Sequence, residues 1–158
     1  MLILPVDGIG AMHEGAIGRK YIELFLEDWQ YISRKIQYPI PLGTSRFVPC
    51  PQGQGYDYLL LASLLNHTEQ ISKSDFRGFV FNAVRQALYL ANGFEIHKVA
   101  SVVLLGGWRL SLDEAFLAML DAYEQAFSFA KGLQFEIYET DDKKFQRING
   151  LARSLGWL

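Results

Sequence analysis

Cysteine is almost absent from this sequence, and so is the spacing of residues that builds a metal centre. The 158 residues include one cysteine, Cys50, and three histidines, His13, His67 and His97. A single cysteine cannot form a disulfide within the chain, and the histidines are too far apart to show zinc-ligand spacing. We therefore expect no disulfide bond, no bound metal and no other resident cofactor.

A strong charge of one sign and long apolar runs are missing as well. The chain has 15 basic and 17 acidic residues, which gives a formal net charge of −2. This balance predicts no broad nucleic-acid surface and no electrostatic attraction to an anionic membrane. No apolar run approaches the ~20 residues that span a bilayer, and the stretch before Asp7 is too short for a secretory signal. The expected location is cytoplasmic.

What the chain does have is enough apolar material for a core. Half of the residues are hydrophobic and 14% are aromatic, and a chain of this length buries roughly 70% of its unfolded surface. The sequence contains no internal repeat, no low-complexity segment and no interdomain linker. We expect one domain over residues 1–158.

Short apolar runs alternate with longer helical patterns. The runs predict strands over Leu2–Val6, Arg46–Cys50, Asp57–Leu65, Val99–Leu105 and Leu133–Tyr138. Apolar residues at helical spacing predict helices over 17–32, 76–91, 112–127 and 145–155. This alternation predicts a single three-layer α/β domain with a mixed, mostly parallel sheet flanked by helices. The short loop between the second and third strands favours an antiparallel hairpin there.

Local signals mark the ends of several helices. Ser72 or Ser74 can cap the second long helix, and Ser111 followed by Glu114 is a capping box for the third. The final helix is expected to begin at acidic residues and to turn four apolar residues inward: Phe145, Ile148, Leu151 and Leu155.

Two glycine-containing turns join a strand to a helix, where ligands of α/β proteins collect. Glycine allows the backbone to approach a ligand closely, and the helix that follows presents unpaired amides that suit a phosphate. The alternative is that these glycines serve only close packing of strand and helix. The first turn supplies the candidate ligand-binding residues Asp7, Gly8, Gly10, Met12, Gly15, Ala16 and Ile17. The second supplies Leu105, Gly106, Gly107, Trp108 and Arg109.

In this order and separation the two turns resemble those of a divergent macrodomain. The closest resemblance is to the compact group that removes ADP-ribose from modified carboxylates or nucleic-acid bases. In that group the first turn is close to Gly-Val-Met-Gly-Lys-Gly-Ile-Ala, and residues 10–17 here are Gly-Ala-Met-His-Glu-Gly-Ala-Ile. The second family turn, near Pro-x-Leu-Gly-x-Gly-x-Gly-Gly-Leu and followed by an acidic-alanine helix start, resembles residues 104–115. The resemblance implies a macro-domain-like fold and an ADP-ribose-like ligand.

The departures from the family pattern concern ligand-binding and catalytic positions. The family asparagine that supports the distal ribose corresponds to Asp7, one motif glycine to His13, and the catalytic lysine of the compact hydrolases to Glu14. The second loop is shorter than the family's and carries Trp108 and Arg109. A carboxylate beside a pyrophosphate is unfavourable unless it points away or meets a cation.

Three functions are therefore open. The first is binding of ADP-ribose or a related nucleotide derivative, with the glycine turns around the phosphates, Asp7 near a ribose and Trp108 against a ring. The second is hydrolysis of an ADP-ribosyl linkage, with His13 or Glu14 handling the proton. The third is a ligand-free assembly or regulatory protein, which could form a homodimer through the aromatic helix faces around Trp29.

Each candidate side chain also has a simpler reading. His13 would be an exposed turn residue, and Glu14 an anion that favours the start of a helix. Trp108 would fill a gap in the core, and Arg109 would be a surface arginine.

Overall fold

Strands and helices alternate along the chain. The computed structural model describes residues 1–10, 16–50, 55–65, 70–130 and 132–158. These residues form, in chain order, β1 (Leu2–Asp7), α1 (Ala16–Leu24), α2 (Leu26–Ser33), β2 (Ser45–Pro49), β3 (Tyr58–Leu65), α3 (Lys73–Gly93), β4 (Lys98–Val102), α4 (Leu112–Ala126), β5 (Gln134–Tyr138) and α5 (Asp142–Ser154). None of these helices combines the length and the apolar composition that a membrane-spanning segment needs.

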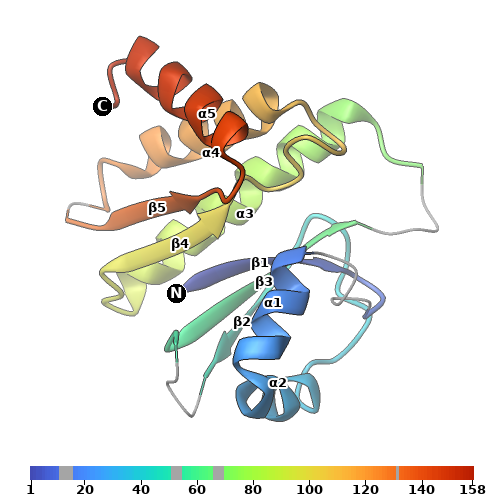
Figure 1. Cartoon of the computed structure of the whole chain (residues 1–158). Coiled ribbons are helices and arrows are strands. Elements are labelled where there is room, and N and C mark those ends of the chain that lie inside the picture. Colours follow the sequence, from blue (N-terminus) through green and yellow to red (C-terminus); the bar gives the residue numbers. More distant parts are fainter. Residues whose placement is uncertain (11–15, 51–54, 66–69, 131) are drawn as a thin grey trace.

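The strands form one sheet in the order β2-β3-β1-β4-β5 (Figure 1). The central strand β1 runs parallel to β3 and β4, and β5 runs parallel to β4. Strand β2 is antiparallel to β3. The sheet is therefore mixed and mostly parallel, and its antiparallel pair is the hairpin that the short loop favoured.

Helices cover both faces of the sheet and divide the core in two. Helices α3, α4 and α5 lie on one face, and α1 and α2 lie on the other (Figure 1). Alternate residues of β1 go to opposite cores, because successive side chains of a strand point to opposite faces. Ile3 joins the larger core under α3 and α4, whereas Leu2 and Leu4 join the smaller core under α1 and α2. The predicted three-layer α/β architecture is confirmed.

The predicted helix caps are present. Ser72 caps α3 by accepting the N–H of Asp75 at 3.2 Å, so Ser72 and not Ser74 is the N-cap. Ser111 accepts the N–H of Glu114, and the Glu114 carboxylate accepts the N–H of Ser111, which completes the capping box of α4.

Strands β1 and β4 separate along their length. In the part of the chain that the structure describes, their register is limited to Leu2 opposite Ala100, while the Ala100 N–H donates to the Met1 carbonyl at 2.9 Å. By contrast, β1 stays paired with β3 as far as Asp7 opposite Leu65. The sheet is therefore closed at the amino end of β1 and open between β1 and β4 at their carboxyl ends.

Three predictions differ from the structure. The helix predicted over 17–32 is two helices, α1 and α2, which are divided at Phe25. The strand predicted over Val99–Leu105 ends at Val102, and Leu105 has a left-handed backbone with φ of 61°. Of the four residues predicted to turn inward in and beside α5, Ile148 is buried and Leu151 is partly buried, but Phe145 and the C-cap Leu155 are exposed.

The face predicted to form a homodimer lies on the outer side of α1 and α2. Leu24, Leu26 and Tyr31 are exposed there, and Trp29 is half-buried against the smaller core. A homodimer through this face stays a prediction.

Candidate functional site

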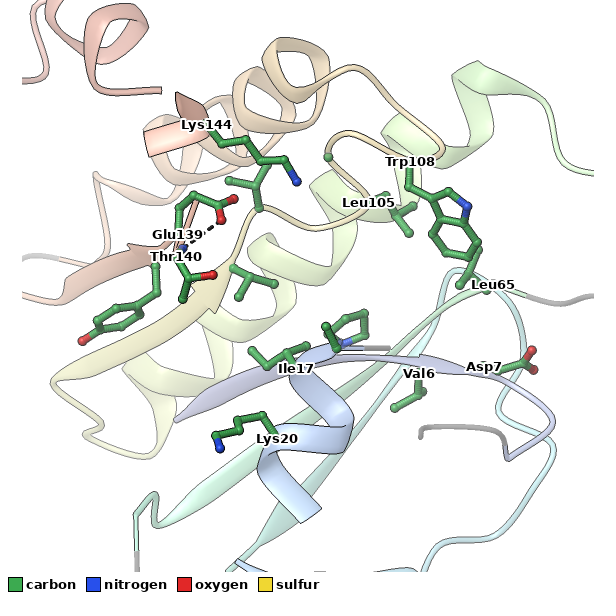
Figure 2. A pocket seen from close by; sticks show the side chains of 16 residues that line it. Val6, Asp7, Ile17, Lys20, Leu65, Leu105, Trp108, Glu139, Thr140 and Lys144 are labelled. Atoms are coloured by element: carbon green, nitrogen blue, oxygen red, sulfur yellow. Dashed lines mark hydrogen bonds between the residues drawn. The ribbon is translucent and has the colours of Figure 1, made fainter. Parts of the chain in front are cut away.

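A cleft of about 700 Å³ lies at the carboxyl ends of the parallel strands (Figure 2). This volume is within the range of roughly 300–1,000 Å³ that small-molecule sites occupy. The cleft is lined by the strand ends, the first turns of α1 and α5 and the loop after β4. The lining residues are Pro5, Val6, Asp7, Ala16, Ile17, Lys20, Leu65, Val102, Val103, Leu105, Gly106, Trp108, Tyr138, Glu139, Thr140 and Lys144.

The topology explains why the cleft forms at this place. From β1 the chain continues through α1 and α2 on one face toward β2 and β3, whereas from β4 it continues through α4 on the other face to β5. The two connections leave neighbouring strands in opposite directions, which opens a crevice outside their carboxyl ends. The separation of β1 from β4 widens that crevice.

Asp7 ends β1 at one side of the cleft, and its side chain is held by the turn that follows. The residue is only 3% exposed, and its Oδ1 accepts the N–H of Ile9 at 2.9 Å. The Gly10 N–H returns to the Asp7 carbonyl at 3.0 Å, with φ of 113° at Gly10, a conformation that favours glycine. The turn therefore fixes one carboxylate at the mouth of the cleft.

Gly8 is buried behind the cleft, and packing explains why this position is a glycine. Its N–H donates to the Leu65 carbonyl, and its carbonyl accepts the N–H of Ile40. A β-carbon at Gly8 would overlap the Ile40 carbonyl oxygen and lie 2.5 Å from Oγ of Ser63. This position needs glycine because two parts of the backbone meet there.

The loop between β4 and α4 is closed by its own hydrogen bonds. The Leu105 carbonyl accepts the N–H groups of Trp108, Arg109 and Leu110 at 3.2–3.3 Å. The Gly106 N–H donates to the Val103 carbonyl, and the Gly107 N–H donates to the Leu110 carbonyl. Five successive amides, from Gly106 to Leu110, are therefore satisfied within the loop, which presents side chains to the cleft.

Trp108 forms part of the rim of the cleft, and Arg109 supports it. The Trp108 side chain is 60% exposed. The Arg109 guanidinium carbon lies 4.6 Å from the centroid of the Trp108 ring and 6.0 Å from that of Phe76. Arg109 is not among the residues that line the cleft, so in this structure its charge is directed at the two rings.

The structure brings together about half of the predicted site residues. The predicted residues that line the cleft are Asp7, Ala16, Ile17, Leu105, Gly106 and Trp108. Four others are in the turns but do not line it: Gly8, Gly10, Gly107 and Arg109. Met12, His13, Glu14 and Gly15 lie outside the described residues.

The far wall of the cleft was not predicted from the sequence. It is formed by the end of β5 and the start of α5, which contribute Tyr138 and the three residues labelled in Figure 2, Glu139, Thr140 and Lys144. The signal that could have found these residues is the strand predicted at Leu133–Tyr138, since carboxyl ends of parallel strands meet at one edge of a sheet.

Hydrogen bonds fix the acidic groups on that wall. The Glu139 carboxylate accepts the N–H groups of Thr140 and Asp141 at 2.8 and 2.9 Å. The Tyr138 hydroxyl donates to the carboxylate of Glu136, and this bond raises the pKa of Tyr138 above its usual value. The Tyr138 ring is more than half exposed and is available to a ligand.

Among the described residues that line the cleft, Lys20 and Lys144 carry positive charge. Lys20 is on α1, where its Nζ is 3.0 Å from the carboxylate of Glu23. Lys144 is on α5, and no carboxylate is within ion-pair distance of its Nζ among the described residues. Within the same part of the chain no group of three or more His, Cys, Asp or Glu side chains is placed to hold a metal ion.

A smaller cavity of about 170 Å³ continues the cleft along α1. It shares Ile17, Lys20, Val102 and Tyr138 with the cleft and adds aromatic walls from Tyr21, Phe25 and Tyr56. The cleft therefore has a polar end near the loop and a more apolar, aromatic extension.

Comparison with known proteins identifies solved structures of the same shape. No family model matches the sequence, and no curated protein matches it. A structure described as alphavirus P23pro-zbd has a TM-score of 0.74 and 17% identity over 98% of this chain, which spans only 22% of the length of that protein.

Two bacterial structures match over most of their own length. The macrodomain of Thermus aquaticus DarG has a TM-score of 0.64 and 16% identity, covering 87% of each chain. A macrodomain of Oceanobacillus iheyensis with ADP has a TM-score of 0.72 and 12% identity, covering 98% of this chain and 83% of the other. At these identities the likeness establishes a shared fold.

Proposed function

The chain has the macrodomain fold, and from that premise we propose that its cleft binds ADP-ribose or a related phosphate-bearing nucleotide derivative. The observation that carries the proposal is the composition of the cleft between β1 and β4. It places the Asp7 carboxylate and Lys20 on the side of β1 and α1, Lys144 and Glu139 on the opposite wall (Figure 2), and the exposed rings of Trp108 and Tyr138 at its rim. A nucleotide sugar has the complementary groups, namely hydroxyls, phosphates and a ring.

The side chains have distinct parts in this proposal. Asp7 is expected beside ribose hydroxyls, because a carboxylate accepts hydrogen bonds at several positions. Trp108 and Tyr138 present ring faces against which a base or a ribose can pack. The lysines balance the charge of the phosphates.

The solved macrodomain that carries ADP supports this class of ligand. It has the same fold and contains ADP, a nucleoside diphosphate, and the cleft of this chain has a size and location that suit such a ligand. Phosphate contacts from the first glycine turn stay a prediction, because residues 11–15 lie outside the described part of the chain.

The hydrolase alternative depends on His13 or Glu14. Both lie outside the described residues, so hydrolysis of an ADP-ribosyl linkage also stays a prediction. Binding is the function that the described residues support.

Calorimetric titration with ADP-ribose at near-physiological salt tests the proposal. We expect saturable binding in the micromolar range for the native sequence. Ala16→Glu should abolish it, because Ala16 lines the cleft and a new carboxylate there would repel phosphate. The same carboxylate favours the start of α1, so the fold should be retained.

Gln30→Glu is the matched control. It adds the same charge at an exposed position of α2 that does not line the cleft, and it should leave binding unchanged. If the native sequence gives no heat of binding up to millimolar ADP-ribose, the proposed ligand is refuted and the assembly role is favoured. Binding that survives Ala16→Glu would place the ligand elsewhere.

A further inference from the structure

The loop between β4 and α4 does not offer its backbone to an anion. A loop that binds phosphate through its main chain needs N–H groups that point away from the loop and toward the ligand. Here the amides of Gly106, Gly107, Trp108, Arg109 and Leu110 all donate to carbonyls of the loop itself. A phosphate beside this loop must therefore find its donors on a neighbouring element.

Lys144 is placed to be that donor. It is in the first turn of α5 and lines the cleft, and Figure 2 shows its ammonium directed toward the space beside the loop. A β-carbon at Gly107 would lie 3.5 Å from Nζ of Lys144, so the ammonium lies directly over the glycine. We propose that Lys144, rather than the backbone of this loop, holds a phosphate of the ligand; this inference rests on the proposed function.

The acidic groups near Lys144 are engaged by the backbone. Glu139 accepts two backbone amides, and the Asp141 carboxylate accepts the backbone N–H of Lys144 at 3.0 Å as the N-cap of α5. Neither carboxylate forms an ion pair with the Lys144 ammonium. The charge of Lys144 is therefore available to a ligand.

The other cations near the cleft are less available. Lys20 also lines it, but its Nζ is paired with Glu23 at 3.0 Å. Arg109 is directed at the rings of Trp108 and Phe76. A lysine ammonium acts as a point charge with three N–H donors, so it can bind the oxygens of either phosphate of a diphosphate.

The glycine at position 107 fits the same arrangement. Its φ of 77° is a conformation that favours glycine. Because Gly107 has no side chain, the Lys144 ammonium can lie close to the turn, and a phosphate can approach it from the cleft. The loop thus leaves space for the Lys144 ammonium, and α5 provides the charge for a phosphate in the cleft.

The test compares Lys144→Gln with Lys143→Gln by calorimetric titration with ADP-ribose at two salt concentrations. Lys143 is the neighbouring exposed lysine of α5 and does not line the cleft. We expect Lys144→Gln to raise Kd about tenfold to a hundredfold, the range for one hydrogen bond to a charged group, and to reduce the salt dependence of Kd. Lys143→Gln should change Kd less than twofold, and Lys144→Arg should retain most of the affinity.

Three results would overturn the inference. The first is an equal effect of the Lys143 and Lys144 substitutions, and the second is an unchanged salt dependence in Lys144→Gln. The third is a larger loss in Lys20→Gln than in Lys144→Gln. If the native sequence binds and Lys144→Gln binds equally well, only this inference fails. If the native sequence does not bind ADP-ribose at all, the proposed function fails with it.

A second measurement is made on the native sequence and needs a variant only to assign one resonance. Reductive methylation with ¹³C labels each lysine ammonium and keeps its charge, and Lys144→Arg identifies the Lys144 resonance by its loss. ADP-ribose should shift that resonance more than those of Lys143 and Lys20. A larger shift at Lys20 would contradict the assignment of the phosphate to Lys144.

Discussion

Gly8 connects the end of β1 with two other parts of the backbone, and replacing it by alanine should destabilise the fold. Its N–H donates to the Leu65 carbonyl at 3.1 Å, and its carbonyl accepts the Ile40 N–H at 2.7 Å. A β-carbon would overlap the carbonyl oxygen of Ile40 and would lie 2.5 Å from Oγ of Ser63. Neither group can swing away, because one is backbone and the other is a buried side chain that donates to the same Ile40 oxygen at 3.0 Å.

The expected size of the effect follows from those contacts. Adding a carbon to a packed site costs about 1–3 kcal/mol, and disturbing the buried bond between Ser63 and Ile40 costs about 1–3 kcal/mol more. Taking about 3 kcal/mol for Gly8→Ala, and about 2–4 °C per kcal/mol for a domain of this size, we expect the thermal midpoint to fall by about 6–12 °C.

Scanning calorimetry of Gly8→Ala and of Gly78→Ala measures this effect against a matched change. Gly78 is inside α3, and a β-carbon there would meet nothing within 4 Å. Alanine should therefore stabilise the helix by about 0.5–1 kcal/mol and raise the midpoint by about 1–4 °C. The reasoning is refuted if Gly8→Ala melts at or above the midpoint of the native sequence.

A double-mutant cycle separates the two contacts of the added carbon. In a Ser63→Ala background the Oγ contact and its hydrogen bond are already gone, so Gly8→Ala should cost only about 1–3 kcal/mol, the overlap with the Ile40 backbone. Additive effects of the two substitutions would show that Ser63 does not restrict Gly8.

Three further outcomes can be measured with standard methods. Hydrogen bonds from Ser111 and Lys73 lower the pKa of Glu114 to about 2. The stability that the ionised carboxylate adds to the fold is therefore complete above its ordinary pKa of 4.5 and is lost as the pH falls toward 2. NMR titration should find that low pKa in the native sequence and a higher one in Ser111→Ala. Burial raises the pKa of the Cys50 thiol, which is 6% exposed, so a thiol reagent at pH 8 should label it only after denaturation; rapid labelling of the native protein would contradict the packing around it. Trp108→Ala should leave the thermal midpoint within about 2 °C, because the ring is mostly exposed, while it weakens ADP-ribose binding.

The elements that the sequence predicts well are those with local signals. Helices α3 and α4 have an unbroken apolar stripe and a serine cap, and the structure has both the stripe and the cap. The hairpin of β2 and β3 follows from a short loop between two apolar runs. These features depend on residues close together in the chain, so no knowledge of the sheet order is needed to predict them.

The division between α1 and α2 could not be predicted in this way. The apolar pattern continues through Phe25, whose φ of −131° and ψ of 48° interrupt the helix. The Phe25 ring packs against Tyr21 with centroids 5.1 Å apart, and it occupies the space where a side chain on Gly55 would lie. The break is thus associated with a contact from a distant part of the chain.

The same limit applies to the candidate site. The two glycine turns stand out in the sequence because both join a strand to a helix, and residues of both line the cleft. Tyr138 and Lys144 face those turns only because β5 lies beside β4, and helix periodicity does not determine strand order. Hydrogen bonds within the second loop are likewise invisible in its sequence, although they decide whether its amides can meet a phosphate.

Pro5 links the sequence to the opening of the cleft. Proline has no N–H to donate, and in a central strand it removes a hydrogen bond of the sheet. The Met1 carbonyl faces β4, where it accepts the Ala100 N–H. Backbone groups of alternate residues in a strand face the same neighbour, so the nitrogen of Pro5 also faces β4. The missing donor therefore falls on the side where β1 and β4 separate, whereas pairing with β3 continues past it from Val6 to Asp7. A residue that is unfavourable in a closed parallel sheet is compatible with this one because the cleft begins beside it.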